Sequence, residues 1–251
     1  MLAAGLTLYS GFGLGTLLLP AFSLFFPVQT AVAATAVVHG ANNLFKLIVV
    51  GIGADRLVVI KFGLPAILAA FVGAASLSYF TQFDALTSYS IGSRTAEVTP
   101  LKLALGLMMI LFALFELVPK LRGLRFDRKY LSVGGVLSGF FGGFSGHQGA
   151  LRSAFLTKVG LSSESFIATN AVIGFLVDLT RLATYATLFL SSGERGISQS
   201  HWPLVLTGVV AAITGILIGK RFLHSVTMSA IQIMTGVLLL GIGLALGAGI
   251  L

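Results

Sequence analysis

The sequence predicts an all-α polytopic membrane protein, and three observations point to that class. Hydrophobic residues make up 56% of the 251 residues and charged residues only 10%, whereas soluble domains carry about 25% charged residues. Apolar runs of the ~20 residues that a helix needs to cross a bilayer recur along the whole chain. The runs are continuously apolar rather than alternating, which favours helices over a β-barrel.

The elements of the first half follow one another through short connections. An apolar segment over residues 1–26 opens the chain, and its glycines at 11, 13 and 15 are expected to interrupt a helix. Long apolar helices are then predicted over 30–53, 57–80 and 100–119. The polar interval 81–99 separates the last two of these helices and predicts a surface loop with short strands.

A basic linker over residues 120–130 joins the first half to the second. Its sequence, KLRGLRFDRKY, holds five basic residues and one acid. A glycine-rich segment over 132–160 follows, and further apolar helices are predicted over 165–190, 202–219 and 228–251. The chain therefore divides into two repeats of four elements each, 1–124 and 125–251, which together form one membrane domain.

The glycine-rich segment is the most informative stretch of the second half. Gly142, Gly143, Gly146 and Gly149 lie within eight positions, and each glycine inside a helix costs about 1 kcal/mol relative to alanine. We therefore expect short helices near 132–141 and 149–159 around an irregular turn. The alternative is that these glycines are close-packing contacts between helices.

The second short helix would begin at an anion-binding arrangement. The first N–H groups of a helix have no partner within it, and the helix dipole is positive at that end. Arg152 would lie in the first turn of this helix, beside His147 and Gln148 of the preceding turn.

The two halves are related by an offset of 134 residues, which aligns both broken segments and the helix after each. Six identities occur over about 35 aligned positions, among them Gly15 with Gly149 and Thr35 with Thr169. The shared order of a broken segment and three further helices favours an internal duplication.

Loop charge distinguishes two topologies, because cytoplasmic loops are richer in lysine and arginine. If both broken segments cross the membrane, 13 basic residues outside the bundle divide eight to five between the two sides. If each broken segment is a re-entrant hairpin, the repeats are inverted and the division becomes ten to three. The re-entrant, inverted arrangement is preferred, with the 120–130 loop on the cytoplasmic side of the cell membrane.

Two stripes of polar residues lie within predicted membrane helices. His39, Asn42, Asn43 and Lys46 share one face of the first long helix by their spacing of three, four and seven residues. The equivalent helix of the second half carries Asn170, Gly174, Asp178 and Arg181 on one face. Ionisable groups inside a membrane usually face the bundle interior or a water-filled path. We therefore expect the two stripes to face each other.

Structural roles compete with functional ones for these residues. Asp178 and Arg181, three residues apart, are also suited to a structural ion pair. Asn42 and Asn170 suit interhelical hydrogen bonds as well as substrate contact. His39 suits either a satisfied position in the core or a functional one.

Other classes of site find no support in the sequence. Cysteine is absent and the four histidines lack metal-ligand spacing, so we expect no metal and no cofactor. The glycine runs fit neither a dinucleotide fingerprint nor a P-loop. The net charge of +8 is explained by cytoplasmic loops and implies no nucleic acid.

The duplicated segments SGFGLGTLLLPAF and SGFFGGFSGHQGALRSAF, with VAATAVVHGANNLFK and FIATNAVIGFLVDLTR, resemble the TauE/SafE (TSUP, sulfite exporter) family of membrane permeases. The resemblance covers essentially the whole chain in two halves. It implies transport of small sulfur-containing or organic anions, such as sulfite or sulfonates, and a cradle formed by residues 11–15 and 142–149. One departure is that His147 and Gln148 interrupt the second glycine run, and Ala154 aligns with Pro20.

The predicted function is therefore a secondary anion transporter, with one half rocking against the other. The expected substrate-binding residues are Gly11, Gly13, Gly15, Asn42, Asn43, Lys46, Gly143, Gly146, His147, Gln148, Gly149, Arg152 and Asn170. His39, His147 and Asp178 are candidates for proton coupling. A passive anion channel is the main alternative, and a membrane enzyme or assembly factor is the third class. The partners expected are the anion, the lipid bilayer and, as one option, a second copy of the chain.

Overall fold

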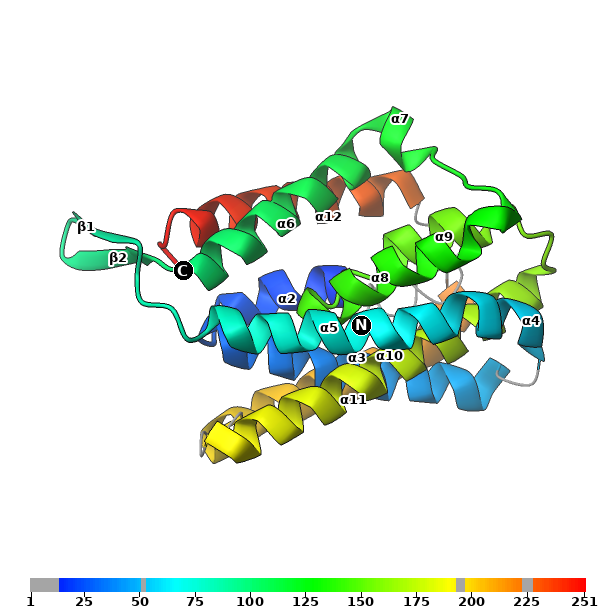
Figure 1. The fold of residues 1–251 in the computed structure, drawn as a ribbon, viewed down its shortest axis with the longest axis horizontal. Helices are drawn as coiled ribbons and strands as arrows, with labels where there is room; N and C mark the ends of the chain where they lie inside the picture. The colour runs from blue at the N-terminus through cyan, green and yellow to red at the C-terminus, as the bar shows by residue number, and fades with distance from the viewer. Residues whose placement is uncertain (1–13, 51–52, 193–196, 223–227) are drawn as a thin grey trace.

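The computed structural model describes residues 14–50, 53–192, 197–222 and 228–251, which form a bundle of helices with one small sheet (Figure 1). The prediction of a mainly helical protein is therefore confirmed for the described residues. Gly11 and Gly13, two of the expected binding residues, lie outside them.

Among its described residues, the first half supplies four main helices. They are α2 (Gly15–Ser23), α3 (Val28–Val50), α5 (Leu64–Phe80) and α6 (Pro100–Leu117). A short helix α4 (Arg56–Val58) and a π-helical turn η2 (Val59–Gly63) lead directly into α5. Side-chain N-caps fix the first residues of two helices. Asp55 Oδ1 accepts a hydrogen bond from Val58 N at the start of α4, and Thr99 Oγ1 accepts one from Lys102 N at the start of α6.

The polar interval between α5 and α6 folds as the expected pair of strands. β1 (Thr87–Ile91) and β2 (Arg94–Val98) pair antiparallel around a two-residue turn, where Gly92 adopts a positive φ of 61°. This hairpin lies at the same end of the bundle as the C-terminus, because Tyr89 Oη donates to Ala248 O and Glu97 N donates to Gly249 O (Figure 1).

The basic linker carries α7 (Pro119–Arg122) and η3 (Arg128–Tyr130), and the second half follows it. The helices of the second half are α8 (Leu131–Ser145), α9 (Gly149–Leu156), α10 (Ser163–Ser192), α11 (Trp202–Phe222) and α12 (Met228–Gly247), with η4 (Gln199–His201) before α11. The helix starts of α2 and α9, Gly15 and Gly149, match the 134-residue offset.

The irregular turn between α8 and α9 is shorter than the sequence suggested. α8 continues through Gly142 and Gly143 to Ser145, so the turn is confined to residues 146–148. The physical reason is helix packing. Added Cβ atoms at Gly139 and Gly143 would lie 2.2 Å from Ala66 O and 2.0 Å from Ala70 O, so α8 lies with its backbone against α5. These glycines are close-packing contacts.

A second close backbone contact joins α6 to α12. A Cβ at Gly106 would lie 2.6 Å from Gly243 O and 2.7 Å from Gly247 N. Both contacts pair a helix of the first half with one of the second. The two sequence halves are therefore interleaved rather than side by side.

Five helical stretches are long and apolar enough to cross a membrane among the described residues. They are Val28–Val49, Arg56–Phe80, Pro100–Leu117, Ser163–Leu188 and Gln199–Ile218, with a shorter apolar stretch at Gln232–Gly247. Large apolar side chains such as Leu68, Phe71 and Val210 are more than half exposed on the outside of the bundle. An apolar exterior of this kind suits a lipid environment.

The charges outside the bundle interior are unevenly placed. The end that carries α4, α7 and η3 holds most of the described basic residues outside the interior, among them Arg56, Lys61, Lys120, Arg122, Arg125, Arg128, Lys129 and Lys158. These segments meet in space, because Ser132 Oγ donates to Lys61 O and Lys158 Nζ lies 3.4 Å from Asp127 Oδ1. We call this the linker end. The opposite end has Arg94 and Lys102 in the described residues.

Candidate functional site

The chain reverses direction at Gly146, between α8 and α9. Gly146 has a φ of 86°, a conformation that side chains with a Cβ rarely adopt. Its N–H donates to Gly142 O (2.9 Å), which closes the end of α8. A Cβ here would lie 2.6 Å from Arg181 Nη1. Glycine is therefore required at this position both by the backbone and by the buried arginine beside it.

After the turn, α9 runs back beside α8 toward the linker end. Ser138 Oγ of α8 donates to Gln148 O at the start of α9 (3.0 Å), and Phe126 N of the linker donates to Ala154 O (3.1 Å). The aromatic ring of Phe155 stacks on Phe126 with centroids 4.2 Å apart. The two helices thus form a hairpin whose open ends lie together at the linker end.

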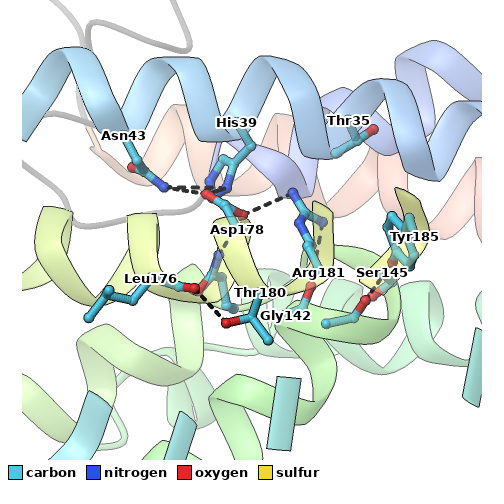
Figure 2. A network of polar contacts seen from close by, with 12 residues as sticks. Thr35, His39, Asn43, Gly142, Ser145, Leu176, Asp178, Thr180, Arg181 and Tyr185 are labelled. Carbon is cyan, nitrogen blue, oxygen red and sulfur yellow. Dashed lines mark hydrogen bonds and ion pairs between the residues drawn. The ribbon is translucent and has the colours of Figure 1, made fainter. Parts of the chain in front are cut away.

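Asp178 is the centre of a buried polar network that joins α3, α10 and the hairpin (Figure 2). On one side, Asn43 Nδ2 donates to its Oδ2 (2.7 Å), and His39 Nδ1 lies 2.7 Å from the same oxygen. On the other side, Gln148 Nε2 donates to Oδ1 (3.1 Å) and Arg181 Nη2 lies 3.0 Å away in an ion pair. The structure therefore brings the two polar stripes face to face.

Arg152 forms the second part of the site, next to the Asp178 network. Its Nη1 donates to Gln148 Oε1 (2.8 Å) and its Nε donates to Asn170 Oδ1. Arg152 is 3% exposed. It lies against Gly174 of α10, where a Cβ would be 3.1 Å from Nη1 and Nη2 and 2.8 Å from Asn43 Nδ2. The absence of a side chain at Gly174 gives the arginine its place between α9 and α10.

The site carries more positive than negative groups. Among the residues that the structure describes, Lys46, Arg152 and Arg181 are buried in it, against one carboxylate, that of Asp178. Burying like charges away from water is unfavourable unless a counter-charge is present. A small anion would supply that counter-charge.

Several polar atoms at the site are buried without a hydrogen-bond partner. They include both amide atoms of Asn42 and Nε of Arg181. Most buried polar atoms in proteins are hydrogen-bonded, so unpartnered donors gathered beside cations are suited to an anionic oxygen. No side chain caps the start of α9, so its first N–H groups add further donors.

The expected residues are placed in different ways. Asn43, Gln148, Arg152 and Asn170 lie within the connected network, and Lys46 and Asn42 share the buried face of α3. His147 is turned toward α6, where its ring stacks on Phe112 at 5.1 Å and its Nδ1 lies 2.9 Å from Ser145 Oγ. Gly143 faces Ala70 of α5, and Gly149 begins α9 as Gly15 begins α2.

Two residues at or near the site were missed in the sequence. Tyr185 Oη donates to Gly143 O (2.5 Å) and thereby ties α10 to the end of α8. Its position four residues after Arg181 continues the polar stripe, which could have revealed it. Glu116 of α6 is 1% exposed, with both oxygens unpartnered. The sequence feature that could have revealed Glu116 is its acidic side chain within the apolar run of residues 100–119.

Metal binding finds no support in the described ranges, where no group of three His, Asp or Glu side chains could hold an ion.

Comparison with known families gives one result over nearly the whole chain. Residues 1–246 match a family model described as "Sulfite exporter TauE/SafE". Neither the curated proteins nor the solved structures yielded a match.

Proposed function

The chain belongs to the TauE/SafE sulfite exporter family, and from this premise we propose that it is a secondary transporter that exports sulfite or a small organic sulfonate across the cytoplasmic membrane. Family membership makes it a multi-pass membrane protein of the anion-exporter type. The substrate, the energy source and the position of the site are our proposal.

One observation carries the proposal: the excess of buried cations over carboxylates beside the hairpin. Arg152 supplies a planar guanidinium, which suits the oxygens of a sulfite or sulfonate group. Lys46 adds charge, and Asn42 adds an amide whose two polar atoms are unpartnered. In this proposal the anion is bound where α3, α9 and α10 meet.

The hairpin of α8 and α9 supports a re-entrant arrangement in the membrane. Its two ends lie together at the linker end, where the basic residues of the described chain are concentrated. Since cytoplasmic loops are enriched in lysine and arginine, we place this end in the cytoplasm. The first half would then carry the inverted counterpart, in which α2 is the equivalent of α9.

Arg152→Gln tests the site. The variant removes the charge and the forked donors while keeping a polar side chain, and we expect it to abolish stabilisation of the purified protein by sulfite, thiosulfate or small sulfonates in a thermal-shift titration. Arg152→Lys keeps the charge without the fork and should bind more weakly. Arg56→Gln is the matched control, because it removes an exposed arginine from α4 and should bind as the wild type does.

Normal anion stabilisation in a folded Arg152→Gln protein would show that the anion binds elsewhere. Flux measurements in proteoliposomes separate the carrier from a passive channel. Saturable flux that responds to a pH gradient indicates a carrier, whereas flux that rises linearly with concentration indicates a pore.

A further inference from the structure

Glu116 lies apart from the polar network, in the last turn of α6. Its side chain is 1% exposed and neither carboxyl oxygen has a hydrogen-bond partner. No described ion pair includes it. An ionised carboxylate in such a place is strongly disfavoured, so the geometry requires the neutral, protonated form in this conformation.

A pocket leads from Glu116 toward the linker end. It encloses about 90 Å³ accessible to water. Its walls come from α6, the α7 segment of the linker, α9 and α12, with Ser153, Thr157 and Gln232 as polar lining. Ser153 is buried while Thr157 and Arg125 are exposed, so the lining passes from the protein interior to the surface.

The charged groups that face Glu116 in this pocket are Arg122 and Arg125, both from the linker. The side of α9 offers hydroxyl groups, and α12 offers the amide of Gln232. Arg122 is engaged elsewhere, since Nη1 donates to Ser229 Oγ (3.2 Å) and Nη2 to Leu117 O (3.4 Å), while its Nε is unpartnered. Arg122 therefore lines the same pocket as Glu116 while its guanidinium is bonded elsewhere.

We propose that Glu116 is the proton-binding residue of the transport cycle and exchanges its proton with the linker side through this pocket. The inference rests on the proposed function, because it assigns the proton coupling of that transporter to one group. With its proton, Glu116 is compatible with the packed conformation described above. When the carboxyl releases its proton to water in the pocket, the resulting carboxylate favours a conformation in which it meets Arg122 or water. Proton release and movement of α6 and α12 together against α9 are thereby linked.

His39 and Asp178 are less suited to this role in the same conformation. Asp178 already accepts from Asn43 and Gln148 and pairs with Arg181. A proton carrier must lose and regain its proton during the cycle, and Glu116 has no competing partner to prevent this.

The transport test compares Glu116→Gln with wild type in proteoliposomes that contain labelled sulfite. Glutamine imitates the protonated carboxyl group, so we expect anion exchange at equal pH to continue within about two-fold, while flux driven by a pH gradient falls about ten-fold or more. Glu164→Gln, which alters an exposed glutamate at the start of α10, should leave both fluxes unchanged. Gradient-driven flux in Glu116→Gln with the pH dependence of the wild type would overturn the proposal.

A second measurement does not depend on the substrate. Dicyclohexylcarbodiimide reacts with protonated carboxyl groups in apolar surroundings, and mass spectrometry locates the modified residue. We expect Glu116 of the wild-type protein to be modified at pH 7, with modification declining at higher pH. Absence of modification except in acid, as for an ordinary glutamate, would refute the proton site even if anion transport is established. Modification at pH 7 without any sulfite flux would instead count against the proposed substrate and leave the proton site standing.

Discussion

Replacing Gly146 by alanine tests the link between the backbone reversal and the buried arginine. The backbone at this residue has a φ of 86°, and a left-handed conformation costs a residue with a Cβ about 1–2 kcal/mol. The new methyl group would also lie 2.6 Å from Arg181 Nη1. Arg181 is fully buried and pairs with Asp178 at 3.0 Å.

The chain offers a matched control in Gly160. This residue has a φ of 85° but no atom within 4 Å of its Cβ position. Gly160→Ala should therefore lower the free energy of unfolding only through its left-handed backbone conformation, by about 1–2 kcal/mol. Gly146→Ala should cost roughly 3 kcal/mol or more, because part of a buried ion pair, whose complete disruption costs about 3–5 kcal/mol, is lost as well.

Thermal melting of the purified proteins, with and without sulfite, measures both effects. We expect the melting temperature of Gly146→Ala to fall further than that of Gly160→Ala, and only Gly146→Ala to lose anion stabilisation. Equal losses in the two variants, with sulfite stabilisation preserved in both, would refute the coupling between the turn and Arg181.

Two further predictions concern packing and topology. Gly139→Ala places a Cβ 2.2 Å from Ala66 O and should destabilise the protein by about 1–3 kcal/mol. The control is Gly241→Ala, in open space on α12, which should be neutral or stabilising by up to about 1 kcal/mol. Equal melting temperatures of the two variants would contradict the close contact of α8 with α5. Single cysteines at Ser162 and Lys129, introduced into this cysteine-free chain, should both react with a membrane-impermeant reagent from the cytoplasmic side, and labelling from opposite sides would exclude the re-entrant hairpin.

Helical periodicity was sufficient to predict which residues of α3 and α10 meet. Residues three, four and seven apart share a helix face whatever the surroundings, so His39 and Asn43 could be expected opposite Asp178, as the structure has them. The substrate-binding role of these residues remains a prediction. The short strands within residues 81–99 could also be predicted from the sequence, because the polarity of this interval excludes a membrane helix there.

Helix contacts distant in sequence limited the prediction elsewhere. Gly142 and Gly143 were expected in a turn because glycine weakens an isolated helix, but contact with α5 stabilises this one, and α5 lies about seventy residues away in the chain. Glu116 was missed for a related reason. An acid near the end of an apolar run is commonly exposed, and only the neighbours that α9, α12 and the linker supply show that this one is buried beside a small pocket.

The glycine contacts of α8 with α5, and of α6 with α12, limit how the molecule can move. Each contact joins residues on opposite sides of the boundary between 1–124 and 125–251, with backbone atoms in direct apposition. A hinge at that boundary would shear both contacts at once. We therefore expect the rigid bodies of a transport cycle to be pairs of helices exchanged between the two repeats. A search for the moving parts should begin with α5 and α8 treated as one body and α6 and α12 as another.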